Sequence, residues 1–175
     1  VKGGIATSFG CPFEGDVPPA QVVRIAQRYA ELGVTRIGLA DTTGMAQPKH
    51  IEAVVRAVRD ALPDADLGLH LHNTRGVGLV NAHVGLRAGI RRLDASIAGL
   101  GGCPFAPGAT GNICTEDLVF MLEGLELRTG VDLDALIGVA RRVQEVIGRE
   151  LPGQVMKAGT REALHPLEAV ETAAG

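Results

Sequence analysis

The segment RIGLADTTGMAQPKHIEAVVRAVRDAL, residues 36–62, contains the pattern that decides the fold. Residues 36–40 predict a strand, because they form a short apolar run that ends in the polar sequence Asp41-Thr42-Thr43-Gly44. Pro48 then opens a predicted helix, since proline is favoured in a first helical turn. That helix carries an apolar stripe at helical spacing, made of Ile51, Val54, Val55, Val58 and Leu62. The segment is therefore one strand followed by one helix.

Similar units precede and follow this segment with a period of about 30 residues. Strands are predicted at residues 4–9, 67–72 and 93–97, and helices follow the first and second of these. A run rich in glycine follows the last strand. Two helices come next, the first with Thr115 as its predicted N-cap and the second over about residues 133–147. Residues 1–150 are predicted to form one domain, and residues 151–175 an irregular or partly helical tail.

The composition suits a parallel sheet covered by helices. Of the 175 residues, 46% are hydrophobic but only 3% are aromatic, so the core must consist of valine, leucine, isoleucine and alanine. Repeated strand–helix units indicate either an open doubly wound sheet or part of a (β/α)8 barrel. The polar clusters fall after the predicted strands, which is where barrel enzymes place their sites. Because a complete barrel needs eight units and about 250 residues, four units make half of one.

Charge and cysteine content exclude several classes of protein. The net charge of −3 gives no basic field for nucleic acid and no polybasic patch for a membrane surface. No apolar run approaches the ~20 residues needed to span a bilayer. The three cysteines form no C-x-x-C pair, which argues against a disulfide framework or a thiolate zinc site and favours a reducing, cytoplasmic compartment. The chain begins at Val1 inside a strand-like segment, so we expect a fragment.

The motif Leu69-His70-Leu71-His72 predicts a metal site. Side chains alternate across a strand, so the two histidines share one face and their roots lie about 7 Å apart, close enough to converge on one cation. The alternative is that both are hydrogen-bonded structural residues near a strand end. Nitrogen ligands completed by oxygen suit Mg²⁺, Mn²⁺ or another first-row divalent ion, and Asn112 can supply an amide oxygen.

Cys103 is the candidate reactive side chain. It lies in SIAGLGGCPFAPGATGN, residues 96–112, among five glycines and two prolines, which is typical of a functional loop. Cys11 lies in a similar Gly-Cys-Pro-Phe run without the glycine-rich flank, so a structural role is favoured. Cys114 is expected to be a small buried apolar residue.

Residues 96–105, SIAGLGGCPF, resemble the active-site signature of the 3-hydroxy-3-methylglutaryl-CoA lyase family. The resemblance covers roughly residues 1–150 and includes GCPFEG (10–15), DTTG (41–44), HLH (70–72), GATGN (108–112) and TEDLV (115–119). These lyases are metal-dependent and are built on a (β/α)8 barrel, and the matched part looks like its last four strands. The implied fold class is α/β, namely the last four βα units of a TIM barrel followed by C-terminal helices.

The resemblance also implies roles for individual residues. His70 and His72 match two ligands of a divalent metal ion, Mg²⁺ or Mn²⁺, and Asn112 matches an asparagine at the same site. Cys103 matches the catalytic cysteine of a mobile loop, and Asp41 an acidic residue that assists proton transfer. The implied reaction is retro-Claisen cleavage of 3-hydroxy-3-methylglutaryl-CoA, an acyl-CoA substrate, to acetoacetate and acetyl-CoA, as in leucine degradation. The complete enzyme is expected to form a homodimer.

Departures from the family pattern leave other functions open. The family's first strand carries an aspartate ligand beside an arginine, and no matching strand precedes Val1. Asn73 stands where aspartate is common and Arg75 where an aromatic residue is common, so a related 3-hydroxyacyl-CoA is an alternative substrate. A related Claisen-type synthase or aldolase and an inactive half-barrel are the alternative functions. A half-barrel is expected to have two open sheet edges and an uncovered apolar interior, and to be weakly active or inactive by itself.

Overall fold

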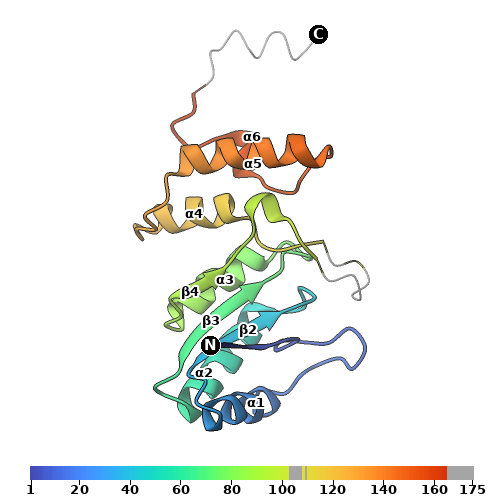
Figure 1. Cartoon of the computed structure of the whole chain (residues 1–175), viewed down its shortest axis with the longest axis vertical. Coiled ribbons are helices and arrows are strands. Elements are labelled where there is room, and N and C mark those ends of the chain that lie inside the picture. The colour runs from blue at the N-terminus through green and yellow to red at the C-terminus, as the bar shows by residue number, and fades with distance from the viewer. Residues whose placement is uncertain (103–107, 109, 165–175) are drawn as a thin grey trace.

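The computed structural model describes residues 1–102, 108 and 110–164 (Figure 1). Strands and helices alternate over the first part of the chain, and helices alone follow. In order, the elements are β1 (Lys2–Ile5), α1 (Pro19–Glu31), β2 (Arg36–Asp41), α2 (Pro48–Ala61), β3 (Asp66–Leu71), α3 (Gly78–Arg87), β4 (Arg92–Asp94), the 3-10 turn η1 (Ile97–Gly99), α4 (Thr115–Gly124), α5 (Leu133–Ile147) and α6 (Val155–Ala158). None of the described helices is long and apolar enough to cross a membrane.

The four strands form one parallel sheet in the order β1-β2-β3-β4. Each strand therefore lies beside its neighbour in the sequence, without the reversal of strand order that defines a doubly wound sheet. This order is that of consecutive barrel strands, and it confirms the predicted four strand–helix units. Within the described part of the chain, β1 and β4 are the two open edges of the sheet.

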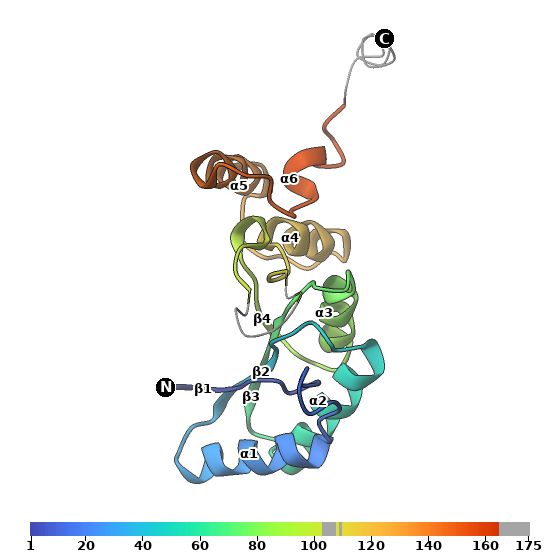
Figure 2. The same cartoon turned by 90° about the vertical axis from the view of Figure 1, so that its right-hand side faces the viewer.

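Helices α1, α2 and α3 pack on one face of the sheet and bury its apolar side chains (Figure 2). Side chains alternate along each strand, so Ile37, Leu39, Leu67 and Leu69 point toward these helices. The helices contribute the predicted apolar stripe of α2, of which Ile51, Val54, Val55 and Val58 are buried. The hydrophobic core thus lies between the sheet and its helices.

The other face of the sheet is polar, and the expectation of an uncovered apolar interior is wrong for the described residues. It carries Lys2, Arg36, Asp66, Arg92 and Asp94, interspersed with glycines. Asp66 accepts hydrogen bonds from Arg36 Nε (3.1 Å) and Arg92 Nε (2.7 Å). Lys2 Nζ donates to Asp94 Oδ2 at 2.6 Å. The charged side chains on this face thus form ion pairs with one another across the strands.

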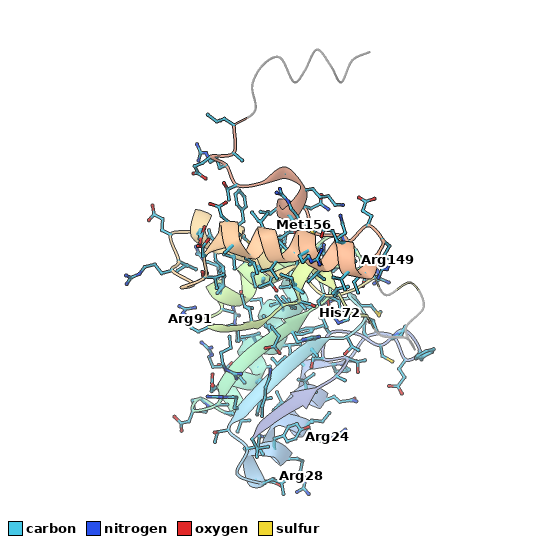
Figure 3. The ribbon with its side chains drawn as sticks, turned by 45° about the horizontal axis from the view of Figure 1, so that its top comes forward. Arg24, Arg28, His72, Arg91, Arg149 and Met156 are labelled. Carbon is cyan, nitrogen blue, oxygen red and sulfur yellow. The ribbon has the colours of Figure 1, made fainter. Side chains whose placement is uncertain are left out.

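The C-terminal helices extend the molecule beyond β4, with α4 packed against α5 and α6 (Figure 1). Helix α5 begins and ends where its periodicity predicts, and Asp132 caps it by accepting from the Ala135 amide at 3.0 Å. Cys114, rather than Thr115, is the N-cap residue of α4. Among the described residues after 150, Val155–Ala158 form the short helix α6. Although the periodicity of this segment is weak, it buries Leu151 and Met156, which pack against α5 and η1 (Figure 3).

Two predicted strands are shorter in the structure. The strand predicted at residues 4–9 is β1, which ends at Ile5 because Thr7 has a left-handed φ of 50°. The strand predicted at 93–97 is β4, which ends at Asp94 before η1. Within η1, Ala98 has a φ of 52°. Positive φ is incompatible with an extended strand, so extended backbone cannot continue past either Thr7 or Ala98.

Candidate metal and active site

The two histidines of the HLH motif converge at the carboxyl end of β3, where Figure 3 marks His72. His70 Nε2 and His72 Nε2 lie 3.3 Å apart, within hydrogen-bonding distance, so one nitrogen of each ring points toward the other. His72 is 5% exposed, and its Nδ1 has no hydrogen-bond partner among the described residues. Burial, together with the neighbouring His70, lowers the pKa of His72. The neutral imidazole is thereby favoured, which is the form that binds a metal.

Asn112 lies beside these histidines, because residues 72 and 112 form an isolated antiparallel bridge. Its Nδ2 donates to the Leu100 carbonyl at 2.8 Å, and its Oδ1 is buried without a partner in the described chain. A buried amide oxygen without a donor is costly unless something binds it. The structure therefore brings together three of the residues singled out from the sequence: His70 and His72 through their Nε2 atoms, and Asn112 through its backbone bridge to His72. No group of three His, Cys, Asp or Glu residues with metal-binding geometry occurs in the described ranges.

Glycines at the base of the loop leave room for Asn112 and for the backbone beside it. Gly111 has a φ of 136°, and a Cβ there would lie 2.7 Å from the Gly101 carbonyl oxygen. Gly101 has a φ of 102°, and a Cβ there would lie 2.6 Å from Asn112 Nδ2. Neither position accommodates a side chain. Cys103 itself lies outside the described residues.

Asp41 is buried at the carboxyl end of β2, but on the opposite face of the sheet from the histidines. The register pairs Ala40 with His70 and Asp41 with Leu71. Asp41 Oδ1 accepts from the amides of Met45 (2.8 Å) and Ala46 (3.1 Å), while Oδ2 has no partner among the described residues. Burial raises the pKa of Asp41, although the two amides oppose this shift. Its observed contacts hold the loop after β2, and its role in proton transfer stays a prediction.

The two positions that depart from the family pattern have local roles. Asn73 Oδ1 accepts from the Gly78 amide at 2.9 Å, at the start of α3. Arg75 donates from its Nη1 to the carbonyls of Thr43 (3.1 Å) and Gly44 (2.8 Å). Arg75 therefore joins the loop after β2 to the loop after β3.

Sequence reasoning missed two acidic residues at this end of the sheet. Asp94 Oδ2 lies 3.7 Å from His70 Nδ1 and forms a salt bridge with Lys2 Nζ. Asp94 was the only acidic residue within the fourth predicted strand, residues 93–97, and that was the available signal. Glu116 is fully buried in the first turn of α4, where its Oε2 accepts from the Ala98 amide at 3.0 Å. Burial raises the pKa of Glu116.

The other cysteines differ in accessibility. Cys114 is buried, as predicted, and burial together with the neighbouring Asp117 and Glu116 raises the pKa of its thiol. Cys11 is partly exposed, and its backbone forms an isolated antiparallel β-bridge with Gly15. A thiol with a raised pKa is a poor nucleophile, so Cys114 is unsuited to chemistry.

Comparison with known proteins places this chain in a family. Residues 2–143 match the HMGL-like family. The chain is 49% identical over 155 residues to the (R)-citramalyl-CoA lyase of Chloroflexus aurantiacus, covering 89% of this chain and 49% of that protein. It is 43% identical over 150 residues to a hydroxymethylglutaryl-CoA lyase of Bacillus subtilis, covering 86% and 50% respectively.

A solved structure of an HMG-CoA lyase has the same fold over most of this chain. An HMG-CoA lyase from Acinetobacter baumannii, in complex with coenzyme A and 3-methylmalate, superimposes with a TM-score of 0.90 and 49% identity, covering 95% of this chain and 54% of that one. The chain thus spans about half the length of the curated relatives it matches. Since the family match extends over most of its residues, the chain belongs to the HMGL-like family.

Proposed function

We propose that the protein is the C-terminal half of a metal-dependent acyl-CoA lyase that cleaves a carbon–carbon bond of 3-hydroxy-3-methylglutaryl-CoA or a closely related 3-hydroxyacyl-CoA. The observation that carries the proposal is the convergence of His70 Nε2 and His72 Nε2, 3.3 Å apart, beside the unpartnered Oδ1 of Asn112. Family membership supports the reaction class. Homodimer formation and a cytoplasmic location stay predictions.

The donor set fits a divalent ion such as Mg²⁺ or Mn²⁺. Two neutral imidazoles and an amide oxygen leave the remaining positions of an octahedral ion to substrate oxygens and water. His70, His72 and Asn112 would hold the ion, which when bound supplies positive charge to orient and acidify a substrate hydroxyl. The lowered pKa of His72 keeps a ligand nitrogen free of its proton.

The chain's own residues would handle protons and position the reacting groups. Cys103 is proposed to deliver a proton to the acetyl-CoA enolate, on a loop whose base is anchored by Asn112 Nδ2 and Leu100. Asp41 is proposed to assist proton transfer. Arg75 holds the loops after β2 and β3 together.

The identity of the substrate is the second part of the proposal. Two relatives with similar coverage of this chain carry different names, a citramalyl-CoA lyase and a hydroxymethylglutaryl-CoA lyase. Their substrates share a tertiary hydroxyl and a carboxylate but differ by one methylene. Cleavage of the first releases pyruvate and cleavage of the second releases acetoacetate, so the keto acid identifies the substrate.

The test uses a chimera in which the amino-terminal half of the Bacillus subtilis relative is fused ahead of Val1. With Mn²⁺, the chimera should release acetoacetate or pyruvate from the corresponding CoA ester. His72→Ala should weaken Mn²⁺ binding at least tenfold in calorimetry and abolish turnover, because it removes one of few ligands. His50→Ala is the matched control, since His50 is exposed on α2. A folded chimera that binds Mn²⁺ and cleaves neither ester would contradict the proposed reaction.

A further inference from the structure

We propose that Asp94 and Lys2 form a positioning pair that sets the tautomer and orientation of His70 from the polar face of the sheet. The inference rests on the proposed metal site and extends it beyond the ligands. Neither residue is itself proposed as a ligand.

His70 and Asp94 are register partners on β3 and β4. Asp94 Oδ2 lies 3.7 Å from His70 Nδ1, while the other ring nitrogen, Nε2, lies 3.3 Å from His72 Nε2. The two nitrogens of the His70 ring thus face different surroundings. One faces a carboxylate, and the other faces the site.

A carboxylate opposite Nδ1 favours the tautomer that carries its proton there. A lone pair on Nδ1 would be repelled by the anionic oxygen, whereas an N–H is attracted to it even at a distance longer than a hydrogen bond. In that tautomer, Nε2 of His70 keeps its lone pair toward His72 and can bind a cation. Histidines that bind metals usually direct their other nitrogen to a carboxylate, carbonyl or water.

Lys2 fixes the carboxylate from the far edge of the sheet. Its Nζ donates to the same Asp94 Oδ2 at 2.6 Å, although Lys2 lies on β1 and Asp94 on β4. The lysine side chain crosses β2 above Gly38, where a Cβ would lie 3.1 Å from Lys2 Cε. Gly38 is paired in register with Gly68 on β3. The missing Cβ of Gly38 therefore leaves room for the lysine side chain, whereas the space above Gly68 holds the side chain of Arg92.

The experiment combines a metal-free readout with metal titration. Nitrogen-15 NMR of the histidines in the metal-free chain, at a pH where the imidazoles are neutral, should show His70 mainly with the proton on Nδ1. Asp94→Ala should shift His70 toward the Nε2-protonated tautomer and weaken Mn²⁺ binding about 10- to 100-fold in calorimetry. Asp94→Asn should preserve part of both properties, because its amide oxygen can still face Nδ1.

Lys2→Met should shift both readouts in the same direction by a smaller amount. Arg36→Met is its matched control, because Arg36 is the register partner of Lys2 but pairs with Asp66. It should leave the His70 tautomer and Mn²⁺ affinity unchanged. An unchanged tautomer in Asp94→Ala, or equal effects of Lys2→Met and Arg36→Met, would overturn the inference. Failure of the wild-type chain to bind Mn²⁺, with the tautomer shift intact, would support the positioning pair and reject the metal site.

Discussion

Glu116 is predicted to hold the base of the glycine-rich loop, and its replacement tests this directly. Its carboxylate accepts from the amide of Ala98, which is buried at a left-handed φ of 52°. Glu116→Ala leaves that amide without an acceptor, at a cost of about 1–3 kcal/mol. It also removes a buried side chain, and the two effects together should lower the free energy of unfolding by about 2–4 kcal/mol.

Glu116→Gln separates the hydrogen bond from the charge. Glutamine keeps an oxygen that can accept from Ala98, so its effect near pH 4 should be within about 1 kcal/mol. The folded-state pKa of Glu116 is raised by burial above its unfolded value. The wild-type carboxyl therefore contributes its full stability below the unfolded pKa, and that contribution is lost as pH rises through the folded pKa. Glutamine does not ionise, so the variant should gain stability relative to wild type over this range.

The assay is urea denaturation followed by far-UV circular dichroism from pH 4 to pH 8. Glu123→Gln, an exposed position on the same helix, is the control and should change the unfolding free energy by less than about 0.5 kcal/mol at each pH. The reasoning is refuted if Glu116→Ala costs no more than the control. It is equally refuted if the difference between wild type and Glu116→Gln does not change with pH.

Three further predictions concern reactivity and assembly. Cys103 should react with thiol reagents before Cys11 and well before buried Cys114, and peptide mapping that finds Cys11 labelled first would reject this order of reactivity. In a complete enzyme, Cys103→Ser should lower kcat by about 10²-fold with little change in KM. Asp41→Asn keeps an acceptor for the loop amides, so a role in proton transfer predicts folded protein with greatly reduced kcat, and normal turnover would leave Asp41 a purely structural role. The chain alone should associate through its open edge strands and turn over weakly, whereas a compact monomer with full lyase activity in light scattering and assay would show the opposite.

The fold was predictable wherever the signal was local. The helix after Pro48 and the helix over residues 133–147 follow from apolar spacing, and their observed limits agree closely with it. The ends of the strands were predicted less accurately. Thr7 and Ala98 have left-handed conformations although neither is glycine, so the sequence gives no signal for them. Pattern alone therefore identifies the elements better than the loops between them.

The site was predictable only as a set of residues. Alternation placed His70 and His72 on one face, and both lie there. The sheet register decides that Asp41 faces the helices and that Asp94 lies beside His70, and no local pattern contains that register. The contact between Glu116 and Ala98 likewise joins segments 18 residues apart. Such long-range contacts need the three-dimensional structure.

The paired charges on the open face of the sheet determine how this half of a barrel would meet a second half. The apolar core lies between the sheet and helices α1–α3, on the other side of the sheet from these charges. The face that would line the interior of a closed barrel carries Lys2, Arg36, Asp66, Arg92 and Asp94, whose interactions are screened by salt. Closure of the barrel should then be sensitive to ionic strength and reversible, and specificity between halves would come from matching charges across the interior.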